Sequence, residues 1–233
     1  MPCGAGQSVA RRAGSWAFAF WAAVAPAPSA SADAIAFGSN LRTAGWSTIS
    51  FPGIPPASFT PGASNTLEVA TNASAGLVWR TVKQAGPTAG EARWSWQVEE
   101  GVAPTDLTRR GHDDRVLAVY FVFGGKADLA RGLVALRSSA SVTSLVYVFG
   151  GDRPRGALLP SPHMGPRGKF VVLRPADAPR RHWFDEHVDL NADYARAFGG
   201  KPPPLLAIAI SSDSDDTRGR NRARLRNLVV DYR

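Results

Sequence analysis

Short apolar runs recur along most of the chain, and glycine, proline, asparagine and aspartate residues separate them at close intervals. Such runs with such punctuation are typical of β-strands joined by turns. In residues 92–98 apolar and polar side chains alternate, as expected for a strand with one buried face. Residues 116–123 and 205–210 are apolar throughout, which indicates central strands between two layers.

About ten strands are predicted in this way. They are expected at residues 46–51, 65–70, 76–82, 92–98, 115–123, 144–150, 169–174, 181–188, 205–211 and 225–232. One helix is expected at residues 190–198, where the apolar residues share one face. Asp189 or Asn191 can cap its start, and Gly199 can take a left-handed conformation after its end. Many strands with one short helix predict an all-β fold, a β-sandwich of jelly-roll type.

The N-terminal segment has the pattern of an export signal. Arg11 and Arg12 precede a short apolar stretch, and small residues follow it. The stretch is shorter than the about 20 residues that a membrane-spanning helix needs, so an uncleaved anchor is the less favoured alternative. Cleavage is expected after Ala32, and the alternatives are Ala30 and Ala34. Residues 1–32 are therefore expected to be a signal peptide, and residues 33–233 a single exported domain in the periplasm or outside the cell.

Cysteine usage and charge narrow the chemistry of this domain. The only cysteine, Cys3, lies in the predicted signal, so residues 33–233 hold no disulfide, thiol nucleophile or cysteine metal site. The chain carries a net charge of +8, which favours polyanionic partners. An exported protein does not meet nucleic acid, so anionic glycans or lipids are expected instead. A general enrichment in arginine is the alternative explanation of the charge.

Three aspartates, Asp213, Asp215 and Asp216, follow the apolar run at residues 205–210. An EF-hand loop counted from Asp213 fails, because Arg218 stands at the glycine position and Arg224 at the glutamate position. A looser calcium site at Asp213 and Asp215 stays open. We expect instead a capped turn whose aspartates pair with nearby arginines. Those arginines are Arg218, Arg220, Arg222 and Arg224.

A second acidic pair, Asp113 and Asp114, stands between His112 and Arg115 at the start of the other apolar run. Neighbouring residues of an extended chain point to opposite faces, so this pair cannot flank one bond as general acid and base. A catalytic pair would need one of them together with a distant aspartate, and salt bridges with Arg80 or Arg115 are favoured instead. If the two apolar strands are neighbours, both aspartate segments meet at one edge of the sandwich.

Residues 181–188 provide a third candidate. Arg181, Trp183, Asp185 and His187 share one face of the predicted strand. A tryptophan between hydrogen-bonding groups suits sugar recognition, and packing of Trp183 against the helix is the structural alternative. The other tryptophans, expected in the core, are Trp46, Trp79, Trp94 and Trp96.

Standard catalytic signatures are absent from the sequence: it has no G-x-S-x-G elbow, no H-E-x-x-H motif and no phosphate-binding glycine loop. Its four histidines show no metal-ligand spacing. No catalytic residue, metal or cofactor is therefore expected.

Several segments together resemble the secreted bacterial proteins catalogued as domain of unknown function 3047. The resemblance spans roughly residues 45–232. It rests on D-D-R before a strand, D-Y-x-x-A-F-G in the helix and D-x-D-x-T after an apolar strand, here at residues 113–115, 193–199 and 213–217. The resemblance implies a family and no catalytic residues.

The leading hypothesis is an exported, non-catalytic β-sandwich that binds a glycan or another envelope component. One alternative is a carbohydrate-active hydrolase or lyase that uses carboxylates of residues 112–115 and 213–216, and another is a structural envelope subunit. The candidate ligand-binding residues are His112, Asp113, Asp114, Arg115, Trp183, Asp185, His187, Asp213, Asp215 and Asp216.

Overall fold

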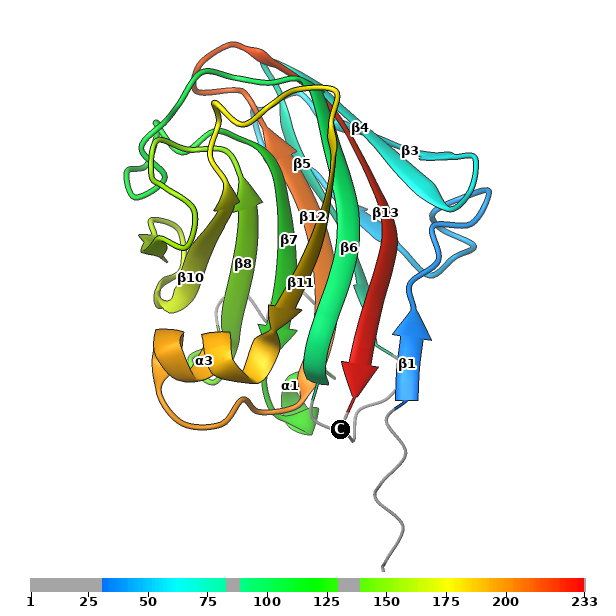
Figure 1. Cartoon of the computed structure of the whole chain (residues 1–233), viewed down its shortest axis with the longest axis vertical. Helices are drawn as coiled ribbons and strands as arrows, with labels where there is room; N and C mark the ends of the chain where they lie inside the picture. Colours follow the sequence, from blue (N-terminus) through cyan, green and yellow to red (C-terminus); the bar gives the residue numbers. More distant parts are fainter. Residues whose placement is uncertain (1–30, 83–88, 130–138, 233) are drawn as a thin grey trace, which may run out of the picture.

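The computed structural model of the chain describes residues 31–82, 89–129 and 139–232, and it is a sandwich of two β-sheets (Figure 1). The strands are β1 Ser31–Ala34, β2 Ser47–Ile49, β3 Ser58–Gly62, β4 Thr66–Asn72, β5 Ala75–Thr81, β6 Ala89–Glu100, β7 Arg115–Phe123, β8 Thr143–Phe149, β9 Leu158–Ser161, β10 Gly165–Arg174, β11 Trp183–Asp189, β12 Leu205–Asp213 and β13 Arg220–Tyr232. The helices are α1 Lys126–Leu129 and α3 Leu190–Phe198. The predicted all-β sandwich of jelly-roll type is confirmed.

Every predicted strand is present, and three strands were not predicted. β1, β3 and β9 have only four, five and four residues, and none has enough length to show a clear alternation. The four-residue helix α1 was not predicted either.

The first sheet has the order β11-β6-β13-β4-β3, with β1 paired to β13, and the second has the order β2-β5-β12-β7-β8-β10-β9. Paired strands run antiparallel except β8 and β10, which are parallel. The two strands that are apolar on both faces, β7 and β12, are neighbours inside the second sheet. Their predicted central position is therefore confirmed.

Aromatic side chains fill the space between the sheets. Trp94 and Trp96 of β6 are fully buried, and their ring centroids lie 5.4 Å apart in an edge-to-face contact. Trp96 also meets Phe149 of β8 edge to face at 5.6 Å. Trp46 is buried as predicted, whereas Trp79 is half-buried and packs with the apolar side chains of the outer face of the second sheet.

The helix α3 has the predicted bounds and covers one end of the sandwich (Figure 1). Asp189 is its N-cap and accepts hydrogen bonds from the backbone N–H groups of Asn191 and Ala192 at 2.9 and 3.0 Å. Gly199 ends the helix with φ 78° and ψ 152°, so its φ is positive but its conformation is not the left-handed helical one expected. Leu190 and Tyr194 are buried against the core.

The start of β7 and the end of β12 lie at the other end of the sandwich from α3 (Figure 1). This end therefore carries both aspartate segments. The predicted signal falls almost entirely on residues 1–30, which lie outside the described residues. Within the described ranges, no helix combines the length and hydropathy needed to cross a bilayer.

Candidate ligand-binding site

A pocket of about 360 Å³ opens on the outer face of the second sheet. Its floor is formed by Leu77, Tyr120, Val122, Phe170 and Ala209. The residues that alternate with them along β7 and β12 point inward and belong to the core between the sheets. The same strands therefore supply the core with one face and the pocket with the other.

Loops from four parts of the chain form the rim of the pocket. Phe51 and Ile54 come from the segment between β2 and β3, and Gly111 comes from the segment before β7. His163 and Met164 lie between β9 and β10. The remaining rim residues, which follow β12, are Asp215 and Asp216.

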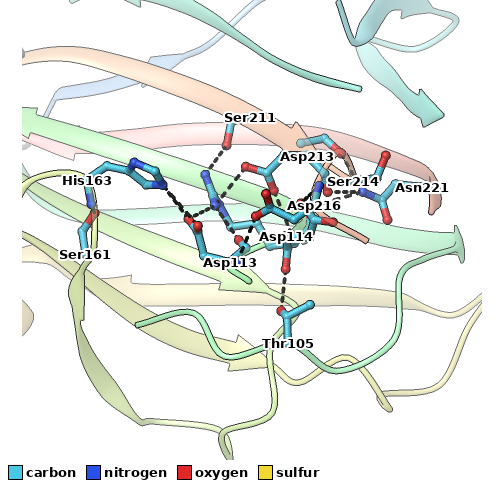
Figure 2. A network of polar contacts seen from close by, with 12 residues as sticks. Thr105, Asp113, Asp114, Ser161, His163, Ser211, Asp213, Ser214, Asp216 and Asn221 are labelled. Carbon is cyan, nitrogen blue, oxygen red and sulfur yellow. Dashed lines mark hydrogen bonds and ion pairs between the residues drawn. The ribbon is translucent and has the colours of Figure 1, made fainter. Parts of the chain in front are cut away.

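The two aspartate segments meet at the polar end of this pocket, which confirms the predicted convergence (Figure 2). The antiparallel register of β7 and β12 places Arg115 opposite Asp213. Asp114 is buried, and its carboxylate accepts hydrogen bonds from the backbone N–H of Thr217 at 2.7 Å and from its hydroxyl at 2.6 Å. The backbone N–H of Asp216 donates to the same carboxylate at 3.3 Å. The carboxylate of Asp114, which precedes β7, thus caps the turn that follows β12.

Arg115 is the centre of the network, with a side chain only 7% exposed. Its Nη1 lies 3.0 Å from Asp213 Oδ2 and donates to the backbone oxygen of Asp113 at 2.9 Å. Its Nη2 donates to the Tyr120 hydroxyl at 2.9 Å, and its guanidinium lies over the ring of Phe170, 5.3 Å from the centroid. Burial by itself would lower the pKa of Arg115. Asp213, Tyr120 and Asp113 raise this pKa by more than burial lowers it, so the net shift is upward and the guanidinium stays charged.

The predicted salt bridge between Asp113 and Arg115 is confirmed. Arg80, the other predicted partner, instead donates to the backbone oxygen of Ala36. For three of the four arginines predicted to pair with the aspartates of the turn, the prediction is wrong. Arg220, Arg222 and Arg224 lie on the outer face of the first sheet, because β13 belongs to that sheet. Their nearest polar partners are Asn72, Glu99 and Glu68.

The pocket as a whole carries more negative than positive charge. Five carboxylates line it, those of Asp113, Asp114, Asp213, Asp215 and Asp216, and two arginines, Arg115 and Arg167. His163 Nε2 lies 3.0 Å from Asp113 Oδ2. The lining is thus acidic in a chain whose net charge is +8.

This crowding affects the aspartates that follow the end of β12. Burial raises the pKa of Asp213 to about 7, although Arg115 opposes the shift. Burial also raises the pKa of Asp215 and of Asp216, and the neighbouring carboxylate of Asp114 adds to both shifts. The protein therefore balances the negative charges of these three carboxylates only in part.

Several pocket residues were missed by the sequence analysis: Phe51, Tyr120, His163, Met164, Arg167 and Phe170. Tyr120 had a signal, since it is the one hydroxyl-bearing residue in an otherwise apolar strand after Arg115. The others had none, because the β9–β10 hairpin and the loop before β3 bring them to the pocket from distant parts of the sequence.

The structure does not bring Trp183, Asp185 or His187 to the pocket. They point outward from β11, an edge strand of the first sheet. Trp183 does not pack against α3: the guanidinium of Arg226 lies 4.0 Å from its ring centroid. Asp185 accepts a hydrogen bond from the Ser95 hydroxyl at 2.6 Å, and His187 Nε2 lies 2.9 Å from Glu91 Oε2. His112 is exposed and does not line the pocket.

The calcium site left open by the sequence at Asp213 and Asp215 lies beside the contacts of Arg115 and of the turn. In the described part of the chain, no group of three or more histidine, cysteine, aspartate or glutamate side chains is arranged to hold a metal ion. Asp213 faces the guanidinium of Arg115, and the nearby Asp114 is engaged by the turn. The carboxylates of Asp213 and Asp114 are thus directed to protein donors.

The chain belongs to the family described as protein of unknown function (DUF3047), whose model matches residues 44–229. No curated protein matches the chain significantly. Among solved structures, a family 29 carbohydrate-binding module is similar with 12% identity and a TM-score of 0.39, covering 87% of this chain and 89% of that one. The xyloglucanase domain of NopAA, a type three effector from Sinorhizobium fredii in complex with cellobiose, is similar with 9% identity and a TM-score of 0.43, covering 81% and 93%. The family 11 carbohydrate-binding module of a cellulosomal cellulase from Clostridium thermocellum is similar with 8% identity and a TM-score of 0.37, covering 80% and 86%.

Proposed function

We propose that this DUF3047 member is an exported protein that binds a glycan, without catalysis, in the pocket on the outer face of its second sheet. The observation that carries the proposal is the composition of that pocket. An apolar floor that includes Tyr120 and Phe170 adjoins a wall of carboxylates and hydrogen-bonding groups. Ligand pockets of this size are typically apolar with a few convergent polar groups. A sugar ring has an apolar face and a polar edge, so it matches both parts.

The state of the carboxylates supports a binding role. Asp114 is held by three hydrogen bonds from the turn, and Asp213 and Asp113 both contact Arg115. A glycosidase needs two carboxyl groups directed at the scissile bond from opposite sides. The observation that favours a hydrolase is the raised pKa of Asp213, which suits a general acid.

The proposal is tested by screening the protein, purified after export from cells that express the full chain, on an array of neutral, amino and acidic glycans. Hits are then measured by calorimetry. Phe51→Ala removes an aromatic ring from the rim and is expected to weaken binding about tenfold, which corresponds to about 1.4 kcal/mol. Trp183→Ala removes an aromatic ring from the outer face of the other sheet and serves as the matched control, with unchanged affinity expected.

Loss of binding in Trp183→Ala, with Phe51→Ala unaffected, would move the site to the first sheet. Absence of binding to every glycan would reject the function. Mass spectrometry of each bound glycan after incubation separates binding from catalysis. A shortened glycan with water added would identify a hydrolase, and a shortened glycan with an unsaturated end would identify a lyase.

A further inference from the structure

The charge of the pocket restricts which glycan it can take. Arg115 is shared between Asp113 and Asp213, and Asp114 is satisfied by the turn. Asp215 lines the pocket and is only partly exposed, yet its carboxylate has no hydrogen bond or ion pair to another described residue. The carboxylate of Asp216 accepts a single hydrogen bond, a long one of 3.4 Å from the backbone N–H of Asp113. Among the described residues, neither of these carboxylates forms an ion pair with an arginine or lysine, and His112 only partly opposes the rise in the pKa of Asp216.

A second observation comes from the other side of the same network. The Nε of Arg115 is buried and has no hydrogen-bond partner among the described residues, although the rest of the guanidinium is fully engaged. A buried donor without an acceptor is costly, and a ligand that supplies one removes the cost. Arg115 lines the pocket, and because its Nε is itself buried, an oxygen atom of a ligand can pair with it after a small shift of the side chain.

The third observation is the apolar floor. Val122, Phe170 and Ala209 are buried in the protein, and together with Phe51 and Met164 they leave a surface on which the body of a ligand can rest. The occupant must therefore combine three properties: a cationic group for Asp215 and Asp216, an oxygen acceptor for Arg115, and an apolar face. A simple alkyl amine lacks the acceptor, and a neutral or acidic sugar lacks the cation.

We infer that the pocket selects saccharides that carry a protonated amino group, the de-N-acetylated amino sugars, with the ammonium group at Asp215 and Asp216 and the ring over the apolar floor. This inference rests on the proposed function and specifies its ligand class. An ammonium group in a partly desolvated site gains from nearby carboxylates far more than it does in bulk water. The anionic glycans favoured by the net charge of the whole chain would be repelled at this pocket, because the local charge has the opposite sign.

The test compares two oligosaccharides with the same sugar backbone, in which each residue carries either a protonated amino group or a neutral acetamido group. Glucosamine tetramer and N-acetylglucosamine tetramer are titrated into the protein by calorimetry, at a pH below the pKa of the sugar amine. We expect the amine form to bind at least tenfold more tightly, and this preference to shrink when salt screens the charges. Asp215→Asn together with Asp216→Asn keeps the side-chain shapes and is expected to abolish the preference.

Asp185→Asn is the matched control, since it removes one carboxylate from the exposed outer face of the first sheet. Its preference for the amine form should equal that of the unchanged protein, and thermal melts confirm that each variant is folded. Equal binding of the two tetramers, or tighter binding of an oligogalacturonate, would overturn the inference and leave glycan binding in place. Failure of every saccharide to bind would reject the proposed function itself.

Discussion

The carboxylate of Asp213 engages Arg115 twice: Oδ1 accepts the backbone N–H of Arg115 at 2.8 Å, and Oδ2 lies 3.0 Å from its Nη1. The two residues are 98 positions apart in the sequence and face each other because β12 pairs with β7. This one contact ties the end of β12 to the start of β7. It also orients the guanidinium toward Tyr120 and Phe170, and so connects the acidic loops to the apolar floor of the pocket.

The turn after β12 should depend on Asp114 for its stability. Asp114→Ala removes the buried carboxylate that accepts from the N–H and hydroxyl of Thr217 and from the N–H of Asp216, and a hydrogen bond to a charged group contributes about 1.5–3 kcal/mol. We expect the free energy of unfolding to fall by about 3 kcal/mol in denaturant melts. Asp215→Ala is the control, because its side chain has no partner among the described residues; its change should stay within about 0.5 kcal/mol. Equal effects of the two variants would show that Asp114 does not hold the turn.

The stability of the fold should also depend on a second buried carboxylate, that of Glu186. It is 1% exposed and accepts hydrogen bonds from Arg174 Nε at 2.6 Å and Trp96 Nε1 at 2.9 Å. Glu186→Ala leaves Arg174 without its counter-ion inside the structure, and we expect a loss of about 3–5 kcal/mol. Glu68→Ala, which breaks an exposed pair with Arg224 at 3.8 Å, should cost less than about 1 kcal/mol in the same melts.

The stability of the protein should depend on pH through Asp213. Its pKa is raised to about 7 in the folded protein from 3.8, so between these values the folded state holds a proton that the unfolded state has released. Stability from this group is therefore present at low pH and is lost as the pH rises from about 4 to about 7. The free energy of unfolding of the unchanged protein, measured relative to that of Asp213→Asn, should fall by at least about 1 kcal/mol between pH 4 and pH 7.

Urea melts of both proteins at pH 4, 5, 6 and 7 measure that difference. Arg115 opposes the effect of burial and of the nearby Asp114 and Asp113 on the pKa of Asp213. A relative gain in stability with rising pH would therefore mean that the ion pair with Arg115 outweighs burial.

Calcium should bind the aspartate cluster weakly. A calcium site gathers about six to eight oxygen atoms, whereas Asp213 here contacts Arg115 and Asp114 is held by the turn. Titration of chelator-treated protein should show no binding tighter than about the millimolar range. Micromolar binding, removed by Asp213→Asn together with Asp215→Asn, would contradict this prediction.

The mature protein is predicted to begin at Asp33, after cleavage at Ala32. The residues of β1 pair with β13, and Asp33 and Ala34 lie opposite Val230 and Val229. Cleavage after Ala34 would remove all of β1 and place a charged terminus on Ile35, whose side chain is fully buried. Its N–H donates to the backbone oxygen of Leu228 at 2.8 Å. Mass spectrometry of the exported protein identifies the first residue, and a start at Ile35 would contradict the prediction.

The sequence alone determined ten of the strands, the central position of β7 and β12, and the helix α3. Each depends on local information: the period of apolar residues along a strand or a helix, and the residues that cap the helix. The apolar composition of β7 and β12 on both faces even predicted that the two aspartate segments meet, because neighbouring central strands bring their ends together.

Only the tertiary structure decided which charges pair and where the pocket lies. Arg220, Arg222 and Arg224 are close to the aspartates in sequence, yet β13 carries them to the other sheet, whereas Arg115 reaches Asp213 through strand pairing. Trp183 faces outward because the register of β11 with β6 places it opposite Gln97, whereas Phe184 lies opposite the buried Trp96. Ion pairs and pockets depend on the register of distant strands and on the paths of loops, and neither is encoded in the periodicity of any single segment.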